Sequence, residues 1–463
     1  MTNRRFLLIV ACLLLSVASV AAQTDRVDAY VRYMMERFHI PGLAMAVVKD
    51  GQVIAAKGYG RASLELDVPV TPETVFEIGS ITKQFTAAAI MLLVEEGKVR
   101  LDDKISTYLP GLPETWSSVT VRHLLTHTSG IKSYTSVMDF LTLCRNDHTS
   151  DEIIRMVSGF PLEFQPGEKW AYSNTGYYLL GLIIEKASGR SYWDFLDERI
   201  FKPLGMTATR SSEPKAIIPH RARGYSWMGD RYVNIDPLTT TAAGAAGAIV
   251  STVLDMARWD AALYTERVLK RSSLDQMWTP ATLTSGQTTD YGFGWRVGEI
   301  RGHRFVQHGG GTPGFRSHFL RLPDDRLTII ILTNRGGSTP AGSIAQGIAR
   351  LYLPDLREEP IEDKDPTTTA MSKNVLLALR NGTLDPDLFT AEARAALFPD
   401  QVKEMRELLE PAGRLRSFHL LERKDEGRLR HYRYRASFEK ESWILTLTQN
   451  VEGKIEALNL WIE

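Results

Sequence analysis

The stretch Phe76-Glu-Ile-Gly-Ser-Ile-Thr-Lys-Gln-Phe85 is the most informative part of this chain. It places Ser80 three residues before Lys83 and opens an amphipathic run that extends from Gln84 to Val99. The run predicts a helix with Ser80 in its first turn and Lys83 one turn later on the same face. A serine hydroxyl is a weak nucleophile that needs an adjacent base, and a lysine amine can act as one when its pKa is lowered. The pair therefore indicates an activated serine at a helix start, where free backbone N–H groups can also bind an oxyanion.

The spacing of Ser80 and Lys83 is not specific by itself. Three further pairs have the same spacing: Ser129/Lys132, Ser212/Lys215 and Ser437/Lys440. The first reads as a turn, the second contains a proline and the third lies in a strand-like stretch. Only Ser80 is followed by an apolar helix, although a serine that caps the helix is the simpler alternative.

Two later motifs accompany Ser80 and Lys83. Trp170-Ala-Tyr-Ser-Asn174 contains a Tyr-x-Asn just before a helical run, and Val306-Gln-His-Gly-Gly-Gly311 reads as a strand that ends in glycines. In this order the three motifs resemble the serine β-lactamase and penicillin-recognising family, nearest to its class C β-lactamase, D,D-peptidase and esterase branch. The resemblance extends from about Asp25 to Leu353. A second Tyr-x-Asn at 232–234 shows that the motifs are specific only as a set.

The resemblance implies a role for each matching residue. Ser80 would be the acylated nucleophile, and Lys83 would share or relay its proton. Tyr172 would be the general base or acid that faces Ser80, and Asn174 would orient Lys83 and the substrate. The oxyanion hole would combine the backbone N–H groups of Ser80 and Gly311, and losing one such donor typically costs about two to three powers of ten in rate.

His308 departs from the family pattern. Most penicillin-recognising enzymes have the lysine of Lys-Thr-Gly at this place, whereas a histidine with a reference pKa near ~6.5 is mostly neutral at neutral pH. Recognition of a substrate carboxylate should therefore be weaker. Gly309 and Gly310 would let the substrate approach the strand edge closely. A histidine packed at a strand end is the alternative interpretation of His308.

These roles predict a secreted serine hydrolase that cleaves an ester or amide bond through an acyl-enzyme. A carboxylesterase and a peptidase for D-amino-acid peptides fit about equally, and a β-lactamase ranks third because of His308. Two alternatives remain: a penicillin-binding-like sensor that is acylated without turnover, and a scaffold whose C-terminal module binds a partner.

No cofactor is expected, and no metal site is predicted. His123 and His127 lie four residues apart, but the glutamate of a His-Glu-x-x-His zinc site is absent.

Composition supports a globular enzyme with a small-molecule or peptide substrate. The 463 residues include 55 basic and 55 acidic side chains, with an apolar content of 43%. This balance gives no reason to expect a nucleic acid as partner. The length allows a large core and more than one domain, and the sequence makes no prediction about oligomeric state.

The N-terminus resembles a secretory signal. Arg4 and Arg5 precede the apolar run Phe6 to Val20, and the small residues up to Ala22 fit a cleavage site. Residues 1–22 are therefore expected to be removed, which leaves no stable membrane span and places the protein in the periplasm or outside the cell. An uncleaved anchor and a lipoprotein site at Cys12 are the alternatives. After cleavage a single cysteine remains, so an intrachain disulfide is excluded.

Hydrophobic patterning predicts an α/β fold of the α+β type for residues 25–355. An antiparallel sheet is built from both ends of this domain, flanked by helices and interrupted by an all-helical insert. A helix at 29–38 precedes a hairpin about Asp50-Gly51. Later strands are expected at Gly292–Val297, Arg304–His308, Phe315–Leu322 and Leu327–Thr333, and a closing helix at Ala341–Tyr352.

A charged, proline-containing linker is expected at residues 356–370. Residues 371–463 are then predicted to form a small α+β domain that loosely resembles cystatin-like or nuclear-transport-factor-like modules. Its expected helices are Asn374–Arg380 and Ala391–Leu409, and its expected strands are Leu415–Glu422, Leu429–Ser437, Trp443–Thr448 and Ile455–Ile462. It contains no convergent set of serine, histidine and carboxylate residues.

Overall fold

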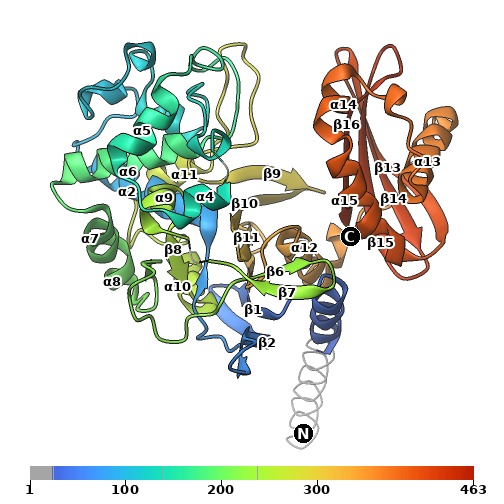
Figure 1. The fold of residues 1–463 in the computed structure, drawn as a ribbon, viewed down its shortest axis with the longest axis horizontal. Helices are drawn as coiled ribbons and strands as arrows, with labels where there is room; N and C mark the ends of the chain where they lie inside the picture. The colour runs from blue at the N-terminus through green and yellow to red at the C-terminus, as the bar shows by residue number, and fades with distance from the viewer. Residues whose placement is uncertain (1–22, 24, 139, 237) are drawn as a thin grey trace, which may run out of the picture. The chain divides into compact units, whose positions relative to one another are not determined.

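The chain forms two compact units, of which the first ends at Tyr352 and the second comprises Leu353–Glu463 (Figure 1). This computed structural model describes residue 23 and residues 25–463 except 139 and 237. The predicted signal segment at residues 1–22 lies outside the described residues. Within the described part of the chain, no helix combines the length and apolar character needed to cross a membrane.

A seven-stranded antiparallel sheet is the centre of the first unit. Its strand order is β3-β2-β1-β12-β11-β10-β9. The strands are β1 (Gly42–Lys49), β2 (Gln52–Ser63), β3 (Val68–Pro69), β9 (Arg296–Ile300), β10 (His303–Thr312), β11 (Phe315–Leu322) and β12 (Leu327–Thr333). Strands from both ends of the unit meet because β1 pairs with β12, as predicted. The hairpin about Asp50-Gly51 is also confirmed, with φ of 53° and 75° at its two turn residues.

One strand lies later in the chain than predicted. The expected strand Gly292–Val297 is instead β9 at Arg296–Ile300. Gly294 has φ of +79°, a left-handed conformation that interrupts an extended run. A Cβ at Gly294 would also lie 2.6 Å from the Lys83 carbonyl oxygen, so the turn packs directly against the chain next to Lys83.

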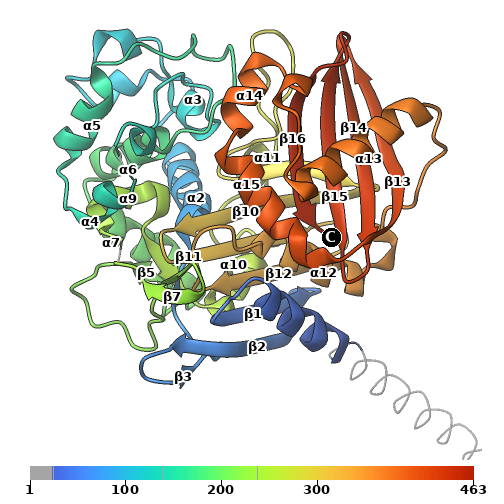
Figure 2. The ribbon, with the colours of Figure 1, turned by 45° about the vertical axis from the view of Figure 1, so that its right-hand side comes forward.

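Helices cover both faces of the sheet. Helix α10 (Val253–Ala262) packs on β1 and β12 from one face, and α12 (Ala341–Tyr352) packs on β11 and β12 from the other. The helix at residues 25–37 lies beside α12 (Figure 2), where the Tyr30 hydroxyl donates to the Ser343 carbonyl. The closing helix α12 has the predicted bounds.

The insert is mainly helical and is built around α2 (Thr82–Glu95). Twelve consecutive residues of α2, from Thr82 to Leu93, are buried. The helix is therefore enclosed on all sides rather than amphipathic, as a helix in the core of a large unit can be. It contacts α6 (Asn174–Ser188) and α9 (Thr240–Gly247).

The prediction of an all-helical insert was incomplete. The insert also contributes β5 (Arg210–Ser211) and β8 (Ile249–Ser251), which form a small sheet with β4 (Phe76–Glu77). A separate hairpin joins β6 (Tyr225–Met228) and β7 (Arg231–Asn234). Its two-residue loop begins with Gly229 at φ of +68°, which is the local signal that favours a tight hairpin.

The second unit contains the predicted antiparallel meander. Its strands pair in the order β13-β14-β15-β16 and span Leu415–Glu426, Leu429–Phe438, Ser442–Asn450 and Ile455–Ile462. Its longer helices are α13 (Pro366–Asn381), α14 (Ala391–Leu397) and α15 (Asp400–Leu409). Strand β14 alternates buried and partly exposed residues, which is the period-2 pattern of a strand with one covered face.

Two helix boundaries in the second unit were wrong. Helix α13 begins at Pro366, inside the predicted linker, because Asp365 accepts a hydrogen bond from the Thr368 N–H and proline suits the first helical position. The single helix predicted for 391–409 is two helices. Phe398, before Pro399, is extended at φ −105° and ψ 140°, as residues before proline prefer.

Candidate active site

Ser80 lies in a single 3-10 turn, Gly79–Ile81, between β4 and the first turn of α2. The α-helix itself begins at Thr82, so Ser80 precedes it by one short turn and does not lie within its first turn as predicted. Gly79 has φ of +52°, and a Cβ there would be 2.5 Å from the backbone nitrogen of Gly311. Only glycine lets this turn press against β10, a requirement that the sequence reasoning missed although Gly79 adjoins Ser80.

Lys83 is completely buried and contacts Ser80 directly. Its Nζ lies 3.0 Å from Ser80 Oγ, 2.8 Å from Asn174 Oδ1 and 2.8 Å from the Ala246 carbonyl oxygen. Burial lowers the pKa of the Lys83 amine well below its usual value. A neutral amine has two hydrogens and one lone pair, so it can donate to Asn174 and Ala246 and accept from the Ser80 hydroxyl.

Tyr172 contacts Ser80 from another side. Burial raises the pKa of the Tyr172 phenol, although its hydrogen bond with Ser80 acts in the opposite direction. The Lys83 Nζ lies 4.8 Å from the centre of the Tyr172 ring. The phenol therefore keeps its proton while the neighbouring amine is poised to lose its charge. Of the two groups, Lys83 has the available lone pair and Tyr172 has the proton to give.

Asn174 begins α6 and is held from two directions. Its Oδ1 accepts from Lys83, while its Nδ2 donates to Thr135 Oγ1 at 3.1 Å. Its backbone N–H donates to Ser133 Oγ at 3.1 Å. These contacts fix the orientation of the Asn174 amide, so its oxygen is held as an acceptor for Lys83. With that hydrogen bond fixed, the lone pair of the Lys83 amine points in a defined direction.

His308 is buried and has partners at both ring nitrogens. Nε2 lies 2.8 Å from the Tyr291 hydroxyl, and Nδ1 lies 2.6 Å from the Gly309 carbonyl oxygen. Burial lowers the pKa of His308 to about 3. In the neutral ring Nδ1–H donates to Gly309 and Nε2 accepts from Tyr291. His308 therefore gives the site no positive charge at neutral pH.

The three glycines after His308 differ in what they contact. Strand β9 pairs with β10 only as far as Gln307, so Gly309, Gly310 and Gly311 lie beyond its end. Gly309 and Gly311 are exposed, whereas a Cβ at Gly310 would be 1.9 Å from the Ile78 carbonyl oxygen. Gly310 is thus required for packing against the segment that carries Ser80, and not for the approach of substrate. Gly311 adjoins the Ser80 turn, where its N–H can serve with that of Ser80 as an oxyanion donor.

His127 holds Tyr172 in place, a role that the sequence reasoning missed. Its Nδ1 accepts from the Ser173 N–H at 3.2 Å, and its carbonyl oxygen accepts from the Ala171 N–H at 3.0 Å. The two ring centres of His127 and Tyr172 are 4.3 Å apart. His127 has φ of 57°, an uncommon value for a non-glycine residue. It therefore fixes the backbone on both sides of Tyr172 as well as its ring.

The two histidines of the weak metal pattern serve different structural purposes. His123 lies in the capping box of the short helix α3 (Val121–Leu125), where its Nδ1 accepts from the Thr120 N–H at 3.2 Å. His127 faces Tyr172 instead. Throughout the described part of the chain, no group of three or more His, Cys, Asp or Glu side chains could hold a metal ion.

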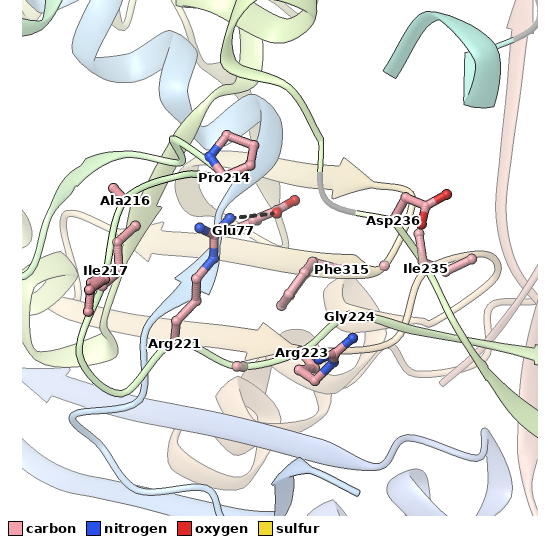
Figure 3. A pocket seen from close by; sticks show the side chains of 13 residues that line it. Glu77, Pro214, Ala216, Ile217, Arg221, Arg223, Gly224, Ile235, Asp236 and Phe315 are labelled. Atoms are coloured by element: carbon pink, nitrogen blue, oxygen red, sulfur yellow. Dashed lines mark ion pairs between the residues drawn. The ribbon is translucent and has the colours of Figure 1, made fainter. Parts of the chain in front are cut away.

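Two cavities adjoin the segment around Ser80. The smaller, of about 50 Å³, is lined by Ser80 and Asn174 among others. The larger, of about 370 Å³, contains an ion pair in which the partly exposed Arg221 lies 3.6 Å from the buried Glu77 (Figure 3). None of the residues that line the larger cavity belongs to the predicted catalytic set. Because Glu77 lies three residues before Ser80, the pair instead anchors the strand that leads to the nucleophile.

Comparison with known proteins gives a consistent result for the first unit. The model of the Beta-lactamase family matches residues 27–353. Penicillin-binding protein 4* of Bacillus subtilis (strain 168) is 36% identical over 66% of this chain and 70% of its own length. A D-aminopeptidase of Gluconobacter oxydans (strain 621H) is 31% identical over 71% of this chain. This chain covers 62% of that enzyme, which is less than two thirds.

Solved structures show the same similarity. The octameric penicillin-binding protein homologue from Pyrococcus abyssi superposes with a TM-score of 0.65 and 26% identity, over 95% of this chain and 96% of that one. The D-amino acid amidase from Ochrobactrum anthropi SV3 superposes with a TM-score of 0.63 and 27% identity, over 72% of this chain and 97% of that one.

Proposed function

This chain belongs to the beta-lactamase family and is a serine hydrolase, and we propose that it cleaves an ester or amide bond through an acyl-enzyme on Ser80. The observation that carries this proposal is the position of the Lys83 amine. It is buried, and its Nζ lies 3.0 Å from Ser80 Oγ with its other hydrogen bonds already made. A base placed in this way can activate a serine hydroxyl.

The geometry supports a defined route for the proton. Lys83 accepts the proton of Ser80 while Oγ bonds to the substrate carbonyl carbon, and the N–H groups of Ser80 and Gly311 stabilise the oxyanion. Tyr172 donates its proton to the leaving oxygen or nitrogen and regains one from Lys83. Water then loses a proton to the same groups, attacks the acyl carbon and releases the acid and the Ser80 hydroxyl.

The proposed location is the periplasm or the outside of the cell. It rests on the basic and apolar pattern of residues 1–22 alone. N-terminal sequencing of the protein purified from its own host tests it, because a mature chain that begins at Gln23 supports export and an intact N-terminus contradicts cleavage.

Labelling with a fluorophosphonate tests the acyl-enzyme proposal. Intact mass should show one adduct on the mature protein and none on Ser80→Ala, because the reagent reacts with activated serines. Steady release of product from an ester or amide would complete the proposal. Absence of an adduct and of hydrolysis would overturn it.

An acylated but slowly released state is a second candidate function. It is favoured by the 36% identity to a protein named Penicillin-binding protein 4*. Exposure to a penicillin distinguishes the two, since a stoichiometric adduct without product would favour the sensor. Turnover of an ester or amide under the same conditions would favour the hydrolase.

The named relatives and the site favour different substrates. The D-aminopeptidase and D-amino acid amidase relatives favour amides of D-amino acids. The neutral His308 offers no negative charge for the ammonium group of a D-amino-acid amide and no positive charge for a substrate carboxylate. Hydrolysis of a β-lactam, which carries a carboxylate, therefore stays the least favoured activity. A simple carboxylic ester has neither an ammonium group nor a carboxylate, so it needs no charged partner.

A further inference from the structure

A groove between α6 and α9 lies outside the site described above. One of its walls is a face of α6, formed by Tyr178, Gly181, Leu182 and Glu185. The last three follow Tyr178 by three, four and seven residues, so all four lie on one side of the helix. Residues of α9, which lies beside α6 (Figure 2), form another wall. The groove has a volume of about 200 Å³, and a cavity of roughly 150 Å³ holds benzene, so a small organic molecule fits.

Two glycines let the two helices approach each other closely. A Cβ at Gly181 would lie 2.6 Å from the Cβ of Ala245, and a Cβ at Gly244 would lie 2.9 Å from two ring carbons of Tyr178. Gly244 also has φ of 46° and ψ of −140°, which interrupts the helical conformation of α9. The hydroxyl of Tyr178 lies 3.4 Å from Ser150 Oγ. These contacts fix the position of the Tyr178 ring in the groove.

Three aromatic side chains line the groove: Tyr178, Tyr192 and Trp193. The last two begin α7 (Tyr192–Leu196), and their ring centres lie 4.8 Å apart at an angle of 75°. Tyr192 is buried, and its hydroxyl lies 2.7 Å from Thr86 Oγ1, which fixes the ring. Trp193 is partly exposed. Aromatic rings that are held in this way can attract a cation with little further loss of side-chain entropy.

The charge of the groove comes from Glu185, which is the one charged side chain among the described residues that line it. Its Oε1 accepts from the Tyr192 N–H at 2.9 Å, which holds the carboxylate next to the aromatic rings. Two further carboxylates, Asp147 and Glu213, accept at 3.0 and 3.3 Å from threonine hydroxyls that line the groove. Within the part of the chain that the structure describes, none of these three carboxylates belongs to an ion pair. The groove therefore has a net negative charge that attracts a cation.

The groove is separate from the cavity at Ser80, although α9 forms part of both. Residues 240–241 and 244–245 of α9 line the groove, whereas residues 242–243 and 246–247 line the cavity at Ser80. No described residue lines both. A molecule in the groove would therefore occupy a site of its own.

We propose that this groove binds a small quaternary ammonium ion, with its charge beside Glu185 and its methyl groups against the three aromatic rings. The inference is independent of the acyl-enzyme proposed above. Aromatic rings and a carboxylate suit this class of ligand, because a quaternary ammonium ion is charged but has no N–H group that needs an acceptor. An anion would be repelled by the carboxylate, and a metal ion such as Ca²⁺ or Mg²⁺ would need more oxygen ligands than one carboxylate supplies.

Titration calorimetry with choline and 3,3-dimethyl-1-butanol tests the charge, because the two molecules differ in having a cationic nitrogen or a neutral carbon at one position. We expect choline to bind the whole protein at one site and the alcohol to bind at least about 10-fold more weakly. Phosphocholine, which has the phosphate of a lipid headgroup, should also bind at least about 10-fold more weakly because of the acidic side chains. Equal affinity for either compound and choline would overturn the proposal. So would the absence of binding heat at choline concentrations up to about 10 mM.

The variant Glu185→Gln tests the carboxylate. The glutamine oxygen can still accept from the Tyr192 N–H, so the contact between the helices is kept while the charge is lost. We expect the affinity for choline to fall by about 10-fold. Glu168→Gln is the matched control, because Glu168 also accepts from a backbone N–H, that of Gln165, and does not line the groove. An unchanged affinity in Glu185→Gln, or an equal loss in Glu168→Gln, would contradict the proposal.

The variant Trp193→Leu tests the aromatic contribution. We expect the affinity for choline to fall by about 10-fold, because leucine is apolar but has no aromatic ring to attract the cation. An unchanged affinity in the folded variant would contradict the role of the rings. Glu185→Gln decides the proposal alone where Trp193→Leu does not fold.

Blocking the nucleophile shows where the ammonium ion binds. We expect the same choline affinity in Ser80→Ala and in the fluorophosphonate adduct as in the unmodified protein, because the groove and the cavity at Ser80 share no described residue. A loss of choline binding in either would place the ammonium ion at the nucleophile and overturn the proposal. Choline binding by a protein that forms no adduct would support this proposal while the acyl-enzyme proposal fails.

Discussion

Two walls of the active site bury ionisable side chains in contrasting ways. The lysine wall consists of Lys83, Asn174 and Ala246, and the histidine wall consists of His127, Tyr291 and His308. In the lysine wall every hydrogen of the amine has an acceptor, and the remaining position faces Ser80. In the histidine wall Tyr291 and Gly309 occupy both nitrogens of His308, and His127 uses one nitrogen to hold the chain at Tyr172.

The contrast shows that one physical cause has opposite chemical consequences. Burial lowers the pKa of Lys83 and of both histidines, because a charged group loses its hydration in the interior. For Lys83 the loss of charge exposes a lone pair next to a nucleophile. For His308 it removes the cation that could bind a carboxylate. We therefore expect the lysine wall to control the reaction and the histidine wall to control geometry and substrate charge.

Lys83→Ala should produce the largest effect. Removing the base beside Ser80 should lower kcat/KM by at least about 10⁴-fold, since residues that act as a unit fail together. The rate of fluorophosphonate adduct formation measures the same loss without a choice of substrate. Lys132→Ala is the control, because Lys132 belongs to another Ser-x-x-Lys match and its ion pair with Glu163 is at least partly exposed. Full activity of Lys83→Ala would show that Lys83 is not the base that activates Ser80.

Tyr172→Phe should be the next most damaging change. It keeps the ring that packs on His127 but removes the hydroxyl that carries the proton to the leaving group. We expect kcat to fall by about 10²- to 10⁴-fold. The loss should be smaller for a p-nitrophenyl ester than for an anilide, because p-nitrophenolate leaves without protonation. An equal loss for both substrates would argue against Tyr172 as the acid.

His127 separates positioning from chemistry. His127→Phe keeps an aromatic ring against Tyr172 but loses the acceptor for the Ser173 N–H, so Tyr172 should be less well placed. We expect kcat to fall by about 10-fold with KM nearly unchanged. His127→Gln can supply a side-chain acceptor and should recover part of the loss. A purely structural role would instead lower the melting temperature of both variants equally and leave kcat of the folded protein unchanged.

The last prediction concerns stability at acid pH and not the reaction. The pKa of His308 is about 3 in the folded protein and near 6.5 in an unfolded chain. The unfolded chain therefore binds the proton first, and the free energy of unfolding falls as the pH drops from about 6.5 towards 3. His308 contributes at most about 1.4 kcal/mol per pH unit to this slope.

Urea titrations at several pH values measure this slope. His308→Gln should make it shallower, because glutamine can keep both hydrogen bonds but cannot be protonated. His318, a partly buried histidine whose pKa is lowered to about 4 by desolvation, stays in the variant and should keep part of the slope. A slope that is unchanged in His308→Gln would mean that His308 does not resist protonation.

Local patterns predicted the regular parts of both units well. Strands β11, β12 and β16 and helix α12 have the predicted bounds, because alternation or a 3.6-residue period appears within each segment. The predictions failed where one residue overrides its neighbours, as Pro399 does between α14 and α15 and Gly294 does before β9.

The candidate site could be assembled from sequence only through its motifs. Ser80, Lys83, Tyr172, Asn174 and His308 were named in advance, and the structure brings them together. What the sequence could not supply were contacts between distant segments. The acceptor that Ala246 offers to Lys83, the close approach of Gly79 to Gly311 and the hold of His127 on Tyr172 depend on the fold. None of these residues has a side chain or spacing that indicates its contact.

The pairing of β1 with β12 has a consequence for the time at which activity can arise during synthesis. Leu43 pairs with Thr333, so one edge of β1 stays unpaired until nearly three hundred further residues have been made, although its other edge pairs with β2. Contacts this far apart in sequence form slowly. The strand segment around His308 and Gly311 also arrives late, so a chain that has not yet reached β10 holds Ser80 and Lys83 without an oxyanion donor from that strand. A nascent chain should therefore gain hydrolase activity only after β10, β11 and β12 have been made.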